Sequence, residues 1–211
     1  MRSLPNWLGI FRIVATPLLV WLVLLGTAAS YLWAALLLVL MALSDMADGR
    51  LARHLQVVSP LGVFLDTISD KIFVAGVLIP MIERDLISSW VAVVIIVREF
   101  VVSGLRSFAA SEGVVIAAGT LGKQKLVIQV TAVVWRLLAA SAATGGAIGS
   151  FGGGLLLPLL NLWPAVMALA VFWTLLSMLD YMRQAWPLLV RSWEPQGRLQ
   201  VYSSGARGNA P

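Results

Sequence analysis

Long apolar runs dominate this sequence and decide what it can fold into. Six of them, each near the roughly 20 residues that a membrane-spanning helix needs, lie at about 8–26, 31–57, 60–80, 87–108, 124–147 and 155–180. Only 12% of the 211 residues are charged and the mean hydropathy is +0.91, whereas about a quarter of a soluble domain is charged. The runs are continuous rather than alternating, which favours helices. The sequence therefore predicts an all-α integral membrane protein built as a six-transmembrane-helix bundle.

The basic residues predict how these helices are oriented. With a cytosolic N-terminus, the cytosolic ends and loops would carry Arg2, Arg50, Arg53, Arg106, Lys123, Lys125, Arg183, Arg191, Arg198 and Arg207. The opposite side would carry only Arg84, and its Gly-rich loop at 144–154 has no charge. Because Lys and Arg concentrate in cytosolic loops, we expect both termini in the cytosol. The net charge of +5 then reflects topology and attraction to anionic membrane lipids rather than nucleic acid.

The remaining composition bears on domain organisation and compartment. The chain has no cysteine, which excludes disulfides, thiolate metal sites and a cysteine nucleophile. We predict one transmembrane domain at 1–190 and a polar, flexible cytosolic tail at 191–211. A compact bundle without a transit-like extension suggests a bacterial cytoplasmic (inner) membrane.

Four aspartates lie inside the second and third apolar runs, where charge is expensive. Asp45 and Asp48 belong to the second run, and Asp66 and Asp70 to the third. Ionisable residues at membrane depth usually face a bundle interior and mark a site. On a helix the first two lie about 60° apart, and the last two stack one turn apart. A short connection near Ser59 makes the two runs antiparallel neighbours, so the carboxylates are expected to converge in a cytosolic-side pocket.

Four converging carboxylates would repel one another unless cations lay among them. Oxygen ligands alone suit hard cations such as Mg²⁺, Mn²⁺ or Ca²⁺, and Mg²⁺ is commonly held together with substrate phosphates. Arg53 follows the acidic set closely and can hold phosphate. Gly49 and Gly62 share the same faces, either to let the helices pack closely or to leave room for a ligand. The combination favours phosphoryl transfer over ion storage.

The pattern Asp-x2-Asp-Gly-x2-Ala-Arg-x8-Gly-x3-Asp-x3-Asp runs from Asp45 to Asp70. It resembles the signature of the CDP-alcohol phosphatidyltransferase family and matches it at every fixed position. The resemblance implies a six-helix membrane bundle of that type, a homodimer, and a cytosol-facing site for Mg²⁺ (or Mn²⁺), with two ions per site. It also implies that the phosphatidyl group of a CDP-linked lipid passes to an alcohol with release of CMP.

The resemblance also implies a role for each motif residue. The residues that resemble metal ligands are Asp45, Asp48, Asp66 and Asp70. The last of these also resembles the base that takes the proton from the attacking hydroxyl. The positions that match contacts to the CDP lipid are Gly49, Arg53 and, as a third candidate, Ser59. Direct attack and a covalent intermediate both stay open, and we favour direct attack because no further nucleophile is evident.

Segments outside the aspartate motif narrow the choice of acceptor substrate. Residues 4–12, 98–106 and 121–125 resemble the phosphatidylglycerophosphate synthase branch of the family, which joins CDP-diacylglycerol to sn-glycerol 3-phosphate. The acceptor phosphate would need cations apart from the metal ions. The candidates, at predicted cytosolic helix ends, are Arg106, Lys123 and Arg183. Anchoring by the positive-inside rule is an equally good interpretation of each, and it is the one we expect for Lys125.

Three further charged residues and two alternative functions remain open at this stage. Arg98, Glu99 and Arg136 lie deeper in the predicted spans, where either an Arg–Glu pair across helices or substrate contact would explain them.

The same scaffold could serve another acceptor, as in cardiolipin synthase, phosphatidylserine synthase or inositol-phosphate transferase. A divalent-cation transporter is the alternative from another class, although its site should be reachable from both sides of the membrane. Here the acids cluster at one side with an arginine.

Overall fold

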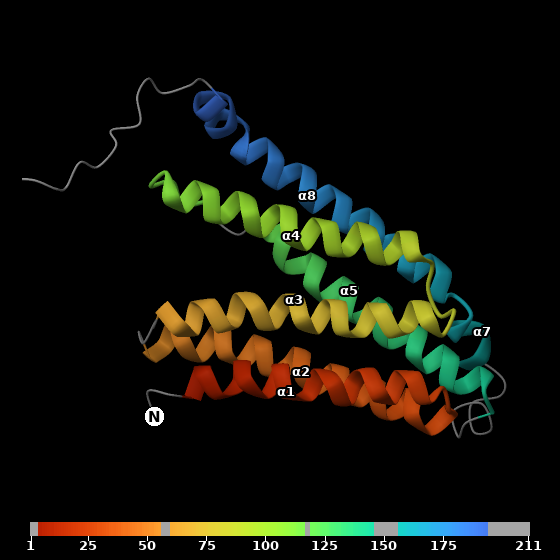
Figure 1. Cartoon of the computed structure of the whole chain (residues 1–211). Helices are drawn as coiled ribbons and strands as arrows, with labels where there is room; N and C mark the ends of the chain where they lie inside the picture. Colours follow the sequence, from red (N-terminus) through yellow and green to blue (C-terminus); the bar gives the residue numbers. More distant parts are fainter. Residues whose placement is uncertain (1–3, 56–59, 117–118, 146–155, 194–211) are drawn as a thin grey trace, which may run out of the picture.

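The computed structural model describes residues 4–55, 60–116, 119–145 and 156–193, apart from the side chains of 4–8, 45–55, 60–66 and 123. Within these ranges the chain is helical, without a strand (Figure 1). The helices are α1 (Leu4–Leu25), α2 (Ala28–Leu55), α3 (Pro60–Glu83), α4 (Ser89–Ser111), α5 (Thr120–Ala143), α7 (Leu156–Leu160) and α8 (Trp163–Trp193). The all-α prediction is confirmed.

The long helices of the described chain pack as a ring. α1 packs against α2 and α3, α5 packs against α2 and α8, and α4 packs against α3 and α8. The order around the ring is therefore α1, α2, α5, α8, α4 and α3, with the short α7 packed on α5 (Figure 1). Each predicted apolar run corresponds to one long helix of this ring, which places residues far apart in sequence on facing surfaces.

The last predicted run differs most from the structure. It is divided at Asn161 into α7 and α8, and α8 continues to Trp193 rather than ending near residue 180. Pro164 stands in the first turn of α8, where a missing backbone N–H costs no helical hydrogen bond. The predicted boundary at 190 therefore falls inside a helix, and residues 194–211 lie outside the described residues.

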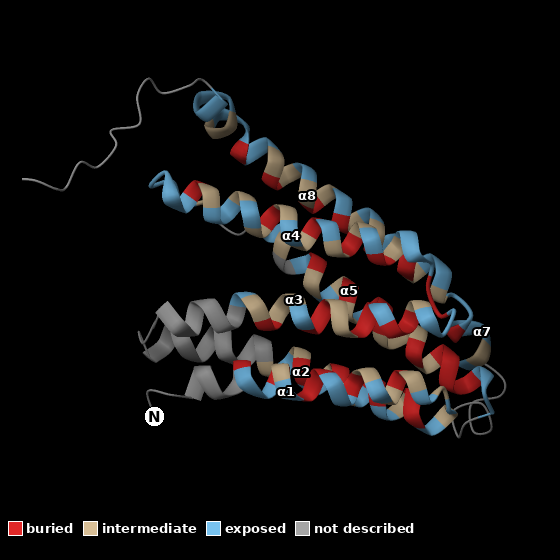
Figure 2. Ribbon diagram, viewed as in Figure 1, coloured by how far each residue is buried: buried red, intermediate tan, exposed pale blue. Residues whose placement is uncertain are grey.

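Apolar side chains cover the outside of the bundle as well as its inside. The outer faces carry Trp21, Trp33 and Trp186, which are between 57% and 62% exposed. Figure 2 shows exposed residues on the outer faces of α4 and α8 and buried residues where helices meet. By length and composition, Thr120–Ala143 and Leu156–Trp193 could each cross a membrane, and the described apolar parts of α1 and α2 are shorter.

The turn between α1 and α2 is closed by local hydrogen bonds. Gly26 has a φ of 66°, the left-handed conformation that commonly ends a helix. The Thr27 hydroxyl accepts from the Ser30 backbone N–H at 3.1 Å, and the Ser30 hydroxyl accepts from the Thr27 N–H at 3.0 Å. These reciprocal bonds satisfy amides at the start of α2. The two helices can therefore reverse direction within two residues.

A close approach between α1 and α3 fixes their relative position. A Cβ atom added at Gly76 would lie 2.2 Å from Cγ2 of Thr16. The Thr16 hydroxyl in turn donates to the Arg12 carbonyl at 2.7 Å, which restrains its side chain. Small residues allow such close packing of helices in membranes. Arg12 and Asp70 precede this contact on their respective helices, so the contact helps to set how far apart they lie.

We predict that Gly76→Ala destabilises the bundle because its methyl group would overlap Thr16. Overpacking of this kind costs about 1–3 kcal/mol, which thermal unfolding in detergent micelles would register as a lower Tm. Gly104→Ala is the matched control, since a Cβ there meets nothing within 4 Å. That substitution should raise the Tm or leave it unchanged, because alanine favours helix. Equal Tm values for the two variants would contradict the close contact.

Candidate active site

Asp70 of α3 forms an ion pair with Arg12 of α1. The Nη1 atom of Arg12 lies 2.9 Å from Oδ1 of Asp70. The Arg12 side chain is 2% exposed, whereas that of Asp70 is 50% exposed. A buried guanidinium is stable in an apolar bundle only if it is paired and hydrogen-bonded, and Asp70 supplies a charged partner. The carboxylate is thus paired with a buried arginine and is itself half exposed.

A second ionic group links α4, α5 and α8. Glu99 accepts hydrogen bonds from the Lys125 ammonium and, at 3.3 Å, from Nη1 of Arg98. Arg98 also donates to the Ser177 hydroxyl from Nη2 at 3.0 Å and from Nε at 3.2 Å. Its guanidinium lies 5.6 Å from the centre of the Tyr181 ring. Each charge in this buried group therefore has a partner, and three helices are held together by it.

The two ionic groups meet at one small cavity. It measures about 20 Å³, room for about one water molecule, and four of its lining side chains are charged: Arg12, Asp70, Glu99 and Lys125. The apolar remainder of the wall is formed by Met41, Ala42, Phe73, Val74 and Leu126. Two positive and two negative charges face this space, so their formal sum is zero. In such a poorly solvated place, electrostatic interactions are stronger than in water.

The structure describes the motif residues unequally. Asp45, Asp48, Gly49 and Arg53 lie on α2 and Asp66 lies on α3, but their side chains are not among those described. Ser59 lies outside the described residues. Among the side chains that are described, no group of three acidic or histidine residues could hold a metal ion. Convergence of the four carboxylates therefore stays a prediction.

The helix backbones are compatible with that prediction. Figure 1 shows the Leu55 end of α2 and the Pro60 end of α3 at the same end of the bundle as the chain's N-terminus. The two helices run in opposite directions, and α1 packs against both of them. The two halves of the aspartate motif are thus brought to one end of the molecule, as the short connection predicted.

The acceptor candidates are only partly described. Arg106 on α4 and Arg183 on α8 both have exposed side chains. Their helices pack against each other. The side chain of Lys123, in the first turn of α5, is outside the described set. Contact of these three residues with a phosphate stays a prediction.

The location of the Lys125 side chain differs from the one that we predicted. We predicted that it anchors the chain at the membrane surface, but it is 3% exposed and pairs with Glu99 inside the bundle. The positive-inside rule counts basic residues near helix ends, whereas this side chain points inward to a carboxylate on α4. The Arg–Glu pairing left open in the sequence is present within α4, and the contact across helices is made by Lys125.

Arg136 has a structural role away from the cavity. Its Nε donates to the Leu86 carbonyl at 2.6 Å, and its guanidinium lies 4.3 Å from the centre of the Trp163 ring. It therefore ties α5 to the α3–α4 loop and to the start of α8. Such a contact satisfies an arginine within an apolar run without a substrate.

Arg12 is the functional candidate that we did not assign from the sequence. The available signal was an arginine inside the first apolar run, a position that requires a partner. The sequence pattern does not identify that partner, because Asp70 lies 58 residues away.

The fold and the charged cavity define an apolar helical bundle with a polar site inside it. The sequence model of the CDP-alcohol phosphatidyltransferase family matches residues 2–176, and the chain belongs to this family. The match covers α1 to α5, α7 and the first part of α8, including the whole aspartate motif and all four charged residues of the cavity.

Several similar bacterial proteins carry the name CDP-diacylglycerol–glycerol-3-phosphate 3-phosphatidyltransferase. The protein of that name from Pseudomonas fluorescens is 32% identical over 211 residues, which cover 98% of this chain and 100% of the relative. The one from Bacillus subtilis is 36% identical over 145 residues, covering 63% of this chain and 75% of the relative. The one from Rickettsia bellii is 36% identical over 131 residues, covering 62% and 72%.

We predict that Lys125→Met destabilises the bundle because Glu99 loses its ammonium partner in a buried place. The loss should be about 2–3 kcal/mol, below the 3–5 typical of a broken buried pair, since Arg98 still contacts the carboxylate. Thermal unfolding in detergent micelles measures it. Adding Glu99→Gln should restore part of the loss. Lys71→Met is the control, because Lys71 donates to the Thr67 carbonyl on the exposed surface. Equal losses in the two lysine variants would contradict the pairing.

Proposed function

We propose that this chain transfers the phosphatidyl group of CDP-diacylglycerol to sn-glycerol 3-phosphate, giving phosphatidylglycerophosphate and CMP. The observation that most directly supports this function is the full-length similarity to the Pseudomonas fluorescens protein, whose name states this donor and this acceptor. The family match over 2–176 and the aspartate motif point to the same transferase chemistry. The enzyme would serve phospholipid biosynthesis in a bacterial membrane.

Asp70 is the proposed general base. The acceptor hydroxyl gives its proton to the Asp70 carboxylate while its oxygen forms a bond to the phosphorus that carries diacylglycerol. The bond from that phosphorus to the CMP oxygen breaks, and CMP leaves with the electron pair. Arg12 supports this role, because its Nη1 atom lies 2.9 Å from Oδ1 of the carboxylate and restrains its orientation. The half-exposed carboxylate can still receive a hydroxyl.

Asp45, Asp48, Asp66 and Asp70 are the proposed ligands of two Mg²⁺ (or Mn²⁺) ions. A set of carboxylate oxygens suits these hard cations, and the exposed face of Asp70 leaves room for coordination beside Arg12. When bound, such ions neutralise charge on the pyrophosphate and on the leaving CMP.

The remaining motif residues have proposed binding roles. Gly49, Arg53 and Ser59 contact the CDP moiety, with Arg53 holding phosphate. The acceptor phosphate is bound by Arg106, Lys123 and Arg183. The exposure of Arg106 and Arg183 on two helices that pack together supports this assignment, since both are free to meet an anion from solution.

The proposed membrane arrangement has six spans, with both termini and the active site cytosolic, and the proposed assembly is a homodimer. Alternation of the long helices along the bundle and the cytosolic excess of basic residues support the topology (Figure 1). The chain has no cysteine, so a single cysteine introduced at Glu112 or at Ala143 would be the only thiol to label. The first position tests the cytosolic side of the membrane and the second tests the opposite side. Labelling of both by an impermeant reagent in intact cells would contradict the topology.

We expect the purified protein to release CMP from CDP-diacylglycerol when sn-glycerol 3-phosphate and Mg²⁺ are present. Chelation of the metal should abolish release, because the pyrophosphate charge would no longer be neutralised. Serine, inositol phosphate and phosphatidylglycerol, each offered in place of glycerol 3-phosphate, separate the related activities. Release with one of these and none with glycerol 3-phosphate would contradict the proposed acceptor.

We predict that Asp70→Asn lowers kcat by roughly 100- to 10,000-fold, the usual contribution of a general base. Binding of CDP-diacylglycerol, measured by calorimetry in nanodiscs, should be retained. The amide oxygen can still accept from Arg12, so the variant should fold, and a thermal melt checks this. Asp85→Asn is the control, because Asp85 lies in the α3–α4 turn with a φ of 53°, which asparagine also adopts. Full activity of Asp70→Asn would contradict the base assignment.

A further inference from the structure

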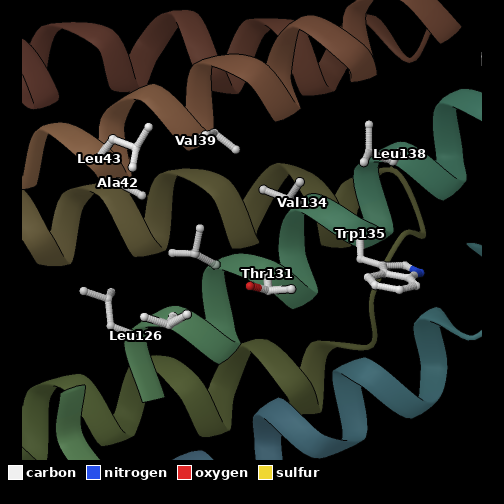
Figure 3. Close-up of a pocket in the computed structure, with 10 residues that line it drawn as sticks. Val39, Ala42, Leu43, Leu126, Thr131, Val134, Trp135 and Leu138 are labelled. Carbon is white, nitrogen blue, oxygen red and sulfur yellow. The ribbon is translucent and has the colours of Figure 1, made fainter. Parts of the chain in front are cut away.

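An apolar groove runs between α2 and α5 (Figure 3). Its volume is about 300 Å³, within the range of small-molecule sites. The lining residues are Val39, Ala42, Leu43, Leu126, Val127, Val130, Thr131, Val134, Trp135 and Leu138. All but Thr131 present hydrocarbon or an aromatic ring, so the groove suits an apolar occupant.

The groove lies next to the charged cavity. Ala42 and Leu126 line both spaces. Lys125, the residue before Leu126, faces the cavity, where it pairs with Glu99. A ligand could therefore place a charged group beside Asp70 and an apolar chain along α5. This junction of a polar and an apolar space fits an amphipathic molecule.

Large side chains stand at the opposite end of the groove. Figure 3 shows Leu43, Ala42 and Leu126 at one end and Trp135 and Leu138 at the other. The thirteen helical residues from Leu126 to Leu138 span about 18 Å from the first Cα to the last. The groove is therefore long and narrow, with bulky groups at the end that lies away from the charged cavity.

We propose that this groove holds one acyl chain of the CDP-linked lipid donor and that Trp135 and Leu138 set the chain length it accepts. The inference rests on the proposed function. A helix from a second copy would cover the groove from outside without reaching the cavity, whereas the donor's polar end belongs at Asp70. Because Ala42 and Leu126 line both spaces, the two parts of such a lipid would lie next to each other.

Selectivity in this groove comes from shape rather than from apolar contact alone. Membrane lipid is as apolar as the groove wall, so moving a methylene from bilayer to groove gains little. A chain that is too long has to turn outward at Trp135, which disfavours that donor. Removing the indole should therefore admit longer chains, and filling the groove midway should exclude them.

The test compares kcat/KM for dilauroyl and distearoyl CDP-diacylglycerol, measured by CMP release with glycerol 3-phosphate in mixed micelles. Trp135→Ala should raise the ratio of long- to short-chain kcat/KM about fivefold. This is below the roughly 10- to 200-fold for one methylene in a closed pocket, because the groove is open on one side. Thr131→Trp, placed midway along the groove, should lower the same ratio by a similar factor.

Trp33→Ala is the matched control, since Trp33 lies on α2 outside the groove and is 62% exposed. It should leave the ratio unchanged. An unchanged ratio in both groove variants, or an equal shift in Trp33→Ala, would overturn the inference. If Trp135→Ala does not fold, Thr131→Trp decides alone. Absence of CMP release from the wild-type enzyme with either donor would instead refute the proposed function.

Discussion

The ion pair between Arg12 and Asp70 is the interaction on which the site depends. In an apolar bundle a guanidinium needs a carboxylate close by, and the carboxylate then loses some of its freedom to turn. The pair requires α1 and α3 to lie close together, which the Gly76–Thr16 contact permits. Packing at a glycine and the placement of a reactive carboxylate are therefore parts of one arrangement.

The charged residues that line the cavity come from four different helices. Arg12, Asp70, Glu99 and Lys125 come from α1, α3, α4 and α5, and their charges balance. Balance keeps the cost of burial low, while the Asp70 side chain stays half exposed. The apolar groove lies next to this cavity, and Ala42 and Leu126 line both spaces. A site with these two neighbouring environments is what an enzyme acting on a lipid headgroup requires.

The sequence predicted the helices well because each apolar run is a local pattern. It also predicted that the aspartate motif would fall on α2 and α3, since all its residues lie within one stretch. It did not predict that Lys125 is buried, because the partner Glu99 lies 26 residues away on another helix. Arg12 was missed for the same reason, at a separation of 58 residues. The end of α8 was predicted too early. The prediction followed apolar content, and the helix continues beyond the apolar run.

A double-mutant cycle on kcat tests most directly whether Arg12 and Asp70 act as one unit. The rates of Arg12→Gln, Asp70→Asn and the double variant would be compared with wild type in the CMP release assay. If Arg12 acts through Asp70, the double variant should be no slower than Asp70→Asn alone. Independent effects that multiply in the double variant would show that Arg12 does not work through this carboxylate, and would contradict the account.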